Sequence, residues 1–375
     1  MSETPILQFG TSRFLLAHAD LFISDAMAAG DERGQITVVQ TTGNAESLRR
    51  VAALNSGKPY PVRIEGLVSG QSVSMMLQGR AISRALSASE DWAAVRKAAL
   101  AARIIISNTG DRGFDLDPTD TRETMADRSH PPASFPAKIA ALLLERFERL
   151  PGDPVSLYPC ELISRNGDRL KGLILSLARD FGFPDTFDSY LGEKCHFANS
   201  LVDRIVSEPL EPVGAVAEPY ALWAIERQEG LELPCTHASI IVTEDLQRYE
   251  TLKLHVLNLG HTVLADLWLK RGLDGQVTVL DMMSDPESRA ILEAAWASEV
   301  IPVFASRSLE SEAAAYVDEV RERFLNPFLR HRLSDIANNH DEKIRRRLVP
   351  VIEMAAEAQL ALSQPILRSI AGLTA

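Results

Sequence analysis

The sequence of 375 residues predicts an α/β fold in two parts: a parallel sheet with helices on both faces, then a mainly helical part. Three observations support this prediction. The chain opens with a short apolar run, a glycine turn and an amphipathic segment. Buried β-branched runs then alternate with helical stretches, and after the proline- and acid-rich residues 210–219 the composition becomes helical. We therefore expect a sheet domain over residues 1–209 and a mainly helical domain over residues 210–375.

The first element indicates a nucleotide site. Residues 5–9 are typical of a strand, Gly10 begins a turn, and residues 15–29 form an amphipathic helix. A strand, a glycine turn and a helix in this order open a Rossmann-type dinucleotide-binding unit, in which a helix N-terminus meets the pyrophosphate. Only one of the usual three glycines is present, so the pattern alone also fits an ordinary turn.

The second strand bears on the cofactor's ribose. Residues 35–40 are β-branched and end at Gln40, followed by Thr41. An acidic residue at this strand end holds the ribose hydroxyls of NAD, and a basic one accepts the 2′-phosphate of NADP. Gln40 and Thr41 are neither, so we expect them to contact the cofactor but leave NAD against NADP open.

Later strands bring more polar groups to the same sheet edge. Residues 60–81 alternate β-like runs with glycines and predict hairpins inserted into the sheet. The next buried strand ends in Ser107, Asn108 and Thr109, where cofactor-facing residues collect in such sheets. A plain strand-to-loop turn explains these three residues equally well.

The most informative stretch is a helix expected over residues 250–267. At about 100° per residue, with Lys253 at zero, Glu250 lies near 60°, His261 near 80° and Asn258 near 140°. Four polar groups therefore share one side of the helix. Burying them requires hydrogen-bond partners, which a ligand can supply. A partly solvated helix face without chemistry gives the same pattern.

Two motifs resemble the long-chain mannitol dehydrogenase family. In the first motif, Lys253 is followed after four residues by Asn258 and after two more by His261, a spacing similar to the family's catalytic signature. In the second, residues 199–205 are similar to the family's Asn-Ser-x-Val-Asp-Arg-Ile motif. The resemblance implies that Lys253 is the general base for alcohol oxidation and that Asn258 and His261 hold the substrate oxygen. It also implies that Glu250 connects the lysine to solvent, although a surface glutamate is an equal reading.

The resemblance spans nearly the whole chain. Gly10 and Phe14 match the family's first motif, while Ser12 replaces its second glycine. Ser107 to Thr109 with Gly113 are similar to the branch of tagaturonate reductases, also called altronate oxidoreductases, where this run lies on the nicotinamide side. The substrate-binding residues implied by the resemblance are Asn166, Asp203, Glu250 and Lys343. The chain is shorter at its C-terminus than these relatives.

Composition excludes several classes of function. A net charge of -12 and a pI near 5.2 disfavour nucleic acid as a partner. The sequence has no apolar run of about 18 residues and no basic secretory leader, so we expect a cytoplasmic protein that does not engage a membrane. Cys160, Cys195 and Cys235 follow no metal-binding spacing, which predicts reduced, buried thiols and no bound metal.

These observations predict an NAD(P)-dependent, metal-independent oxidoreductase, with NAD the expected cofactor and NADP possible. Its substrates would be a sugar acid or polyol and the keto form, with tagaturonate/altronate or fructuronate/mannonate expected. A basic set, Arg330, His331, Lys343 and residues 345–347, can receive a sugar carboxylate or simply be solvated. The alternatives are a mannitol-type hexitol 2-dehydrogenase and a non-catalytic nucleotide- or sugar-binding regulatory protein. We expect a monomer or homodimer.

Overall fold

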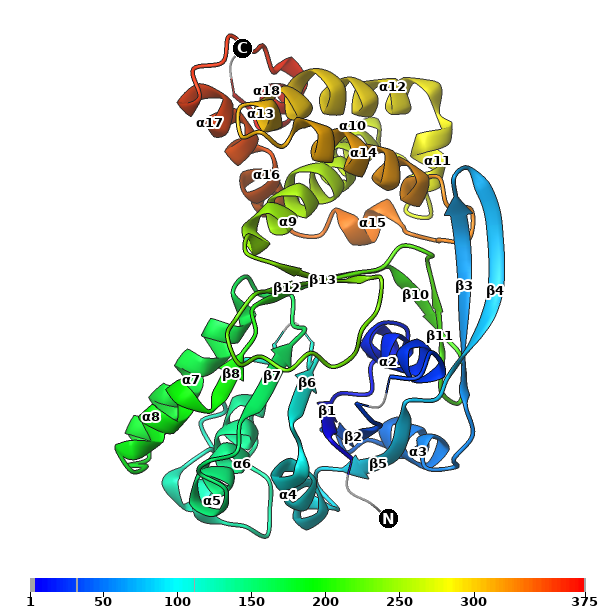
Figure 1. Ribbon diagram of the computed structural model, residues 1–375. Coiled ribbons are helices and arrows are strands. Elements are labelled where there is room, and N and C mark those ends of the chain that lie inside the picture. The colour runs from blue at the N-terminus through cyan, green and yellow to red at the C-terminus, as the bar shows by residue number, and fades with distance from the viewer. Residues whose placement is uncertain (1–3, 32, 111, 374–375) are drawn as a thin grey trace. The chain divides into compact units, whose positions relative to one another are not determined.

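The computed structural model describes residues 4–31, 33–110 and 112–373, which fold into two compact units (Figure 1). Unit 1 comprises Met1–Ile64 and Met75–Leu246, and unit 2 comprises Glu65–Ser74 and Gln247–Ala375. The boundary expected near Pro209 therefore lies inside unit 1. Composition misplaced it because the residues that follow Pro209 form strands of unit 1 rather than helices of unit 2.

Unit 1 is built on a six-stranded sheet in the order β5-β2-β1-β6-β7-β8, with every pairing parallel. Its strands are β1 (Ile6–Phe9), β2 (Ile36–Gln40), β5 (Ile82–Ser87), β6 (Ile104–Ser107), β7 (Val155–Pro159) and β8 (Cys195–Phe197). Taken in chain order, this is the 3-2-1-4-5-6 arrangement of dinucleotide-binding sheets. The predicted Rossmann-type fold is confirmed.

Both faces of this sheet are covered, because adjacent residues along each strand contact different cores. Leu7 and Phe9 of β1 pack with helices α4, α6, α7 and α8, while Ile6 packs with α1 and α2. The helices of unit 1 are α1 (Arg13–Leu16), α2 (Ala19–Ala28), α3 (Ala45–Leu54), α4 (Trp92–Ala101), α5 (Arg122–Ala126), α6 (Phe135–Arg149), α7 (Asn166–Asp180) and α8 (Thr186–Glu193). Such double burial explains the continuous Val and Ile runs of the strands.

Two smaller sheets complete the β structure. A four-stranded sheet has the order β10-β11-β3-β4 and a three-stranded sheet the order β13-β12-β9. Their strands are β3 (Tyr60–Val68), β4 (Gln71–Gly79), β9 (Ser200–Asp203), β10 (Val206–Pro209), β11 (Ala215–Ala217), β12 (Leu222–Glu226) and β13 (Ile240–Thr243). The hairpin predicted from residues 60–81 is present as β3–β4, but it belongs to the four-stranded sheet and is not inserted into the six-stranded one.

The tip of this hairpin belongs to unit 2. The backbone N–H groups of Ser69 and Gly70 donate to the carboxylate of Glu322 at 3.3 and 2.7 Å. The side-chain amide of Asn326 donates to the carbonyl of Glu65 at 3.1 Å. Residues 65–74 are thus fastened to a helical unit from which they are far away in sequence.

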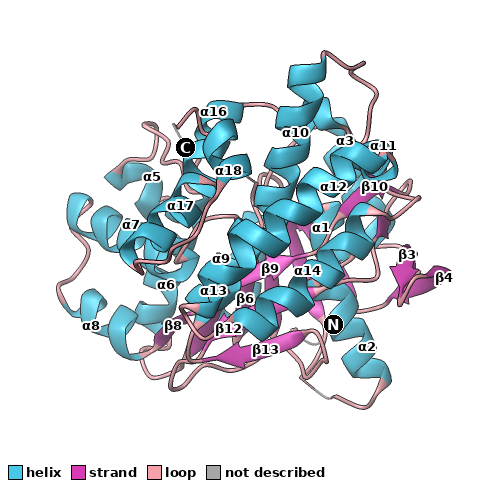
Figure 2. Cartoon of the chain, turned by 90° about the horizontal axis from the view of Figure 1, so that it is seen from above, coloured by secondary structure: helices cyan, strands magenta, loops and turns pink. Residues whose placement is uncertain are grey.

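Unit 2 is otherwise helical, as Figure 2 shows by colour. Its helices are α9 (Leu246–Leu252), η1 (Lys253–Asn258), α10 (Leu259–Arg271), α11 (Val279–Ser284), α12 (Pro286–Ala294), η2 (Ala295–Val300), α13 (Ile301–Ala305), α14 (Glu310–Phe324), α15 (Leu333–Ile336), α16 (His340–Arg347), α17 (Val349–Glu357) and α18 (Pro365–Ile370). Both η segments are π-helices. None of the helices in the described ranges combines the length and apolar character needed to cross a membrane.

Candidate active site

The carboxyl ends of β1 and β6 meet at the point where the strand order of the unit 1 sheet reverses. Gly10 has φ +109°, and a Cβ atom there would lie 2.5 Å from the carbonyl oxygen of Asn108. The backbone N–H of Asn108 donates to the carbonyl of Phe9 at 3.0 Å, and the Ser12 hydroxyl donates to the Asn108 side chain at 3.3 Å. Gly10, Ser12 and Asn108 therefore lie together where such sheets bind dinucleotides.

Gly10→Ala is expected to destabilise unit 1 and abolish NADH binding, because both the positive φ and the approach of Asn108 exclude a side chain. A matched control is Gly30→Ala, where φ is +95° but no atom lies within 4 Å of the added Cβ. The control should lose only about 1–3 kcal/mol of unfolding free energy from backbone strain and retain NADH binding. Urea unfolding and NADH fluorescence titration measure both effects. Equal losses in the two variants would contradict the close-contact explanation.

The end of β2 is neutral and tied to the glycine turn. The Thr11 hydroxyl donates to the side-chain oxygen of Gln40, whose amide nitrogen donates to the Thr42 hydroxyl. Gln40 is buried, whereas Thr41 is half-buried. No charged group takes part in these bonds. Sequence reasoning missed Thr11, since nothing in the pattern showed that it would join the two strand ends.

The polar end of β6 is organised by a residue that the sequence analysis did not select. Glu161 accepts hydrogen bonds from the Ser107 hydroxyl at 3.0 Å and from the Thr109 hydroxyl and backbone N–H at 2.8 and 3.0 Å. Burial raises the pKa of the Glu161 carboxyl, while the bonds from Thr109 and Ser107 lower it. The Ser107 and Thr109 hydroxyls therefore hold the loop to Glu161. A charged residue two positions after the end of β7 was the available signal.

Asn166 is used differently from the substrate role implied by the resemblance. Its amide nitrogen donates to the carbonyls of Pro159, Glu161 and Ser200, and its oxygen accepts from Gly167 and Ser200. The residue is 1% exposed. Because the amide hydrogens and the oxygen of its side chain all bond backbone groups, Asn166 holds β7 next to β9, and its side chain has no donor or acceptor left for a substrate.

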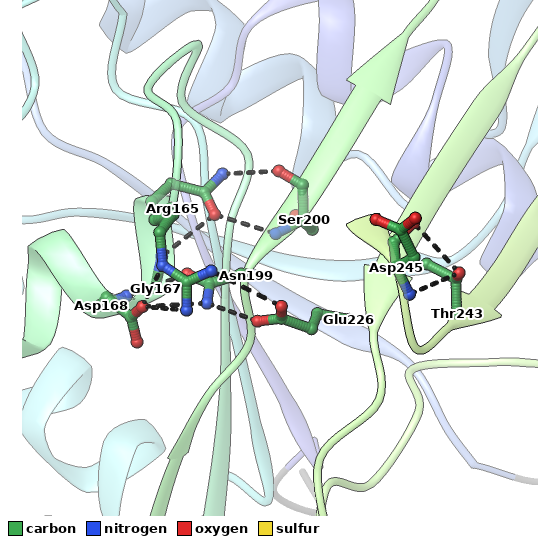
Figure 3. A network of polar contacts seen from close by, with 9 residues as sticks. Arg165, Gly167, Asp168, Asn199, Ser200, Glu226, Thr243 and Asp245 are labelled. Carbon is green, nitrogen blue, oxygen red and sulfur yellow. Dashed lines mark hydrogen bonds and ion pairs between the residues drawn. The ribbon is translucent and has the colours of Figure 1, made fainter. Parts of the chain in front are cut away.

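The second family motif, residues 199–205, adds further hydrogen bonds between elements of unit 1 (Figure 3). The Asn199 side chain accepts from the backbone N–H of Asp168 at 3.0 Å and donates to the Asp168 and Glu226 carboxylates at 3.2 and 2.7 Å. Arg204 donates to the carbonyls of Ala17 and Glu218, and burial lowers its pKa to about 10. Asp203 is buried at the end of β9. The motif thus joins α7, β12 and the end of α1 within unit 1.

The predicted catalytic residues lie along one continuous helix of unit 2, but its register differs from the prediction. A uniform α-helix placed Asn258 about 140° from Lys253, at the far edge of the side that the four polar groups share. The structure has α-helix to Leu252, π-helix from Lys253 to Asn258, and α-helix again from Leu259. Because π-helical hydrogen bonds run from residue i to i+5, this turn holds more residues, and positions five apart come closer to one side. Glu250 lies one turn earlier, in α9.

The His261 ring is fixed between two other rings. It stacks on Phe324 with centroids 4.4 Å apart and meets the edge of His331 at 4.8 Å. The residue is 6% exposed. Burial lowers the pKa of His331; Asp335 opposes this shift, and Arg323 and Lys343 add to it. His331 is thus held towards its neutral form beside His261.

The basic set separates into engaged and exposed members. The Lys343 ammonium donates to the carbonyl of Ile336 at 2.7 Å, and burial together with Arg347 lowers its pKa. Arg347 donates to the Asn258 carbonyl at 3.2 Å and to the Thr262 hydroxyl at 3.0 Å. The exposed members are Arg330, Arg345 and Arg346.

Other predicted groups are placed as follows. Phe14 stacks on His18 with ring centroids 4.8 Å apart. The three cysteines are buried free thiols, as predicted. Within the described ranges, no group of three or more His, Cys, Asp or Glu side chains is arranged to hold a metal ion.

Comparison with known proteins supports the sequence resemblance. Residues 4–234 match the model of the mannitol dehydrogenase Rossmann domain, and residues 245–375 match the model of the mannitol dehydrogenase C-terminal domain. The altronate oxidoreductase of Bacillus subtilis strain 168 is 32% identical, covering 98% of this chain and 78% of that protein. That of Halalkalibacterium halodurans is also 32% identical, covering 92% of this chain and 69% of that protein.

Solved structures share the fold. A substrate-free D-sorbitol dehydrogenase superposes with a TM-score of 0.78 at 19% identity, covering 95% of this chain and 76% of that one. Pseudomonas fluorescens mannitol 2-dehydrogenase, in a ternary complex with NAD and D-mannitol, superposes with a TM-score of 0.74 at 18% identity, covering 98% of this chain and 78% of that one. The two family models together account for both units and nearly every residue, so this chain belongs to the mannitol dehydrogenase family of oxidoreductases.

Proposed function

We propose that this protein is an NAD-dependent oxidoreductase that reduces a keto sugar acid to its hydroxy acid and catalyses the reverse oxidation, with tagaturonate and altronate as the leading pair. The observation that carries this proposal is the retention of Lys253, Asn258 and His261 on one helix in a chain 32% identical to altronate oxidoreductases. The enzyme would work in the cytoplasm on small molecules, as a monomer or homodimer.

Residues of unit 1 fit a dinucleotide. Gly10 leaves room for a close approach at the switch point, and the start of α1 supplies backbone N–H groups for a pyrophosphate. Ser12, Phe14, Gln40, Thr41 and Asn108 would surround the cofactor, with Ser107 and Thr109 shaping the loop through Glu161. The bound nicotinamide supplies or accepts the hydride at its C4 atom. Gln40, being neutral, would bond the ribose hydroxyls in place of a carboxylate.

Residues of unit 2 would handle the substrate oxygen. Lys253 takes the hydroxyl proton during oxidation and returns it during reduction, as a general base and acid. The Asn258 amide and the His261 ring stabilise partial negative charge on that oxygen, which requires fixed donors. The ring contacts of His261 with Phe324 and His331 supply such rigidity. Glu250 would pass the proton from Lys253 towards solvent, while Lys343 would contact the rest of the sugar.

The test is the absorbance of reduced cofactor followed over time with tagaturonate, fructuronate and fructose, using NADH and NADPH in parallel. We expect a uronate to be reduced faster than fructose, and NADH to be preferred. Faster reduction of fructose would assign a mannitol-type hexitol 2-dehydrogenase instead. NADH binding without turnover of any substrate would indicate the non-catalytic binding protein.

A further inference from the structure

The π-helical turn η1 interrupts the helix that carries the three proposed catalytic residues. Its bonds run from i to i+5, including that from the Leu259 N–H to the Leu254 carbonyl, and α10 then returns to i→i+4. Where the spacing shortens, carbonyl groups outnumber the helical N–H groups by one. Additional donors from elsewhere in the fold can therefore stabilise such a turn.

Two side chains from distant segments supply donors to carbonyls of η1. The indole N–H of Trp296, in η2, donates to the carbonyl of Val256 at 3.2 Å, as a second donor beside the backbone N–H of Leu259. Arg347, at the end of α16, donates to the carbonyl of Asn258 at 3.2 Å, beside the Thr262 hydroxyl, which donates to the same carbonyl at 2.9 Å. The carbonyl of Arg347 is itself bonded to the His255 ring at 2.9 Å. Trp296 is fully buried, and burial lowers the pKa of Arg347 to about 10.

Gly260 makes the indole contact possible. A Cβ atom on this residue would lie 2.8 Å from Cζ2 of Trp296 and 3.1 Å from Cε2 of Phe324. Phe324 is the ring that stacks on His261. The missing side chain at Gly260 therefore admits both the indole that bonds η1 and the phenyl ring that supports the histidine.

We infer that Trp296 and Arg347 are positioning residues that hold η1 in its π-helical register and thereby keep Lys253 and Asn258 on one side of the helix. The inference rests on the proposed function for its effect on rate. In an α-helical register, residues five apart are rotated by about 140°, which would turn the Asn258 amide away from the amine. Neither positioning residue needs to touch the substrate.

The principal test compares Trp296→Phe with Trp268→Phe. Both replacements remove an indole N–H that donates to a backbone carbonyl, that of Val256 in the first case and that of Asp274, at 2.9 Å, in the second. We expect kcat of Trp296→Phe to fall about 10- to 100-fold, since small misplacements have effects of this size. The NADH dissociation constant should stay unchanged, and Trp268→Phe should keep the wild-type kcat. A Trp296→Phe variant that is less heat-stable but equally fast would overturn the inference.

Arg347 is tested by conservative rescue. Arg347→Met should lose kcat and change the pH profile of kcat, whereas Arg347→Lys should recover much of the rate by restoring one donor. The control is Arg346→Met, because the Arg346 side chain is 72% exposed and pairs with Glu342 at 3.6 Å. Equal rates for the Met and Lys variants would overturn the role of this hydrogen bond.

A measurement that needs no turnover separates this inference from the proposed function. Amide hydrogen exchange of a peptide covering residues 253–262 should accelerate in Trp296→Phe and Arg347→Met but not in the two controls. If the wild-type protein reduces no substrate while exchange accelerates as expected, the proposed function fails and the register assignment stands. Unchanged exchange in both variants overturns the register assignment, whatever the activity.

Discussion

Lys253→Ala is expected to lower kcat by at least about 100-fold, the usual contribution of a positioned general acid or base, while NADH binding is unchanged. The physical reason is that no proton can pass between the substrate oxygen and an alanine. Stopped-flow and steady-state absorbance at saturating NADH and keto acid measure the loss. Because an absent amine can be supplied from solution, added methylamine should restore part of the rate.

The control for this substitution is Lys270→Ala. Lys270 lies in α10 of the same helix, its side chain is 53% exposed, and its ammonium pairs with Asp266 at 2.7 Å. This variant should retain the wild-type kcat. A Lys253→Ala enzyme that keeps more than about a tenth of the wild-type rate would remove the general base from the proposed mechanism.

Asp20→Asn is expected to make the protein more stable than the wild type above pH 7. Asp20 lies in α2 and is fully buried, and burial raises the pKa of its carboxyl from 3.8 to about 7 despite a hydrogen bond from Gln8. Among the described residues, the second oxygen of Asp20 and the side-chain oxygen of Gln8 both lack partners. A protonated Asp20, or an asparagine, brings a donor into this pair.

The sign of the pH effect follows from the two pKa values. Below about pH 4 both folded and unfolded chains hold the proton. Between pH 4 and 7 only the folded chain holds it, so unfolding free energy falls as pH rises, by about 1.4 kcal/mol per unit and on the order of 4 kcal/mol in all. Above pH 7 both chains are ionised and the loss is complete.

Urea unfolding of both proteins from pH 4 to 8.5 isolates this effect, because groups common to the two proteins cancel in the difference. The advantage of Asp20→Asn should grow across that window and then level off. A difference that does not vary with pH would show that Asp20 is not buried as the protonated acid. Gln8 also donates to the carbonyl of Gly10 at 3.3 Å, so NADH affinity measured over the same range would report any coupling to the glycine turn.

Local sequence patterns were sufficient for the sheet. The apolar runs of β1, β2 and β6 are hydrophobic because both faces are buried, and Gly10 is required by its positive φ and by the approach of the Asn108 carbonyl. The same reasoning failed for the domain boundary expected near Pro209, because the residues that follow it form the strands β11, β12 and β13 of unit 1.

The candidate site was only partly predictable, because its geometry depends on long-range partners. Lys253, Asn258 and His261 were found from their spacing, but a periodic α-helix could not show a π turn whose donors come from Trp296 and Arg347. Glu161 and Thr11 were missed for the same reason. Asn166 was given a substrate role by resemblance, and only its hydrogen bonds to three backbone carbonyls revealed a structural one.

The hairpin tip held by Glu322 limits how members of this family can exchange parts by recombination. A chimaera that receives residues 247–375 from a relative inherits a new partner for Ser69 and Gly70 but keeps the old tip. The segment that must be exchanged as a whole is therefore discontinuous in the gene. It consists of the helical unit and of ten residues encoded far upstream of it. Crossovers that move both pieces together should yield folded hybrids more often than those that move the C-terminal segment alone.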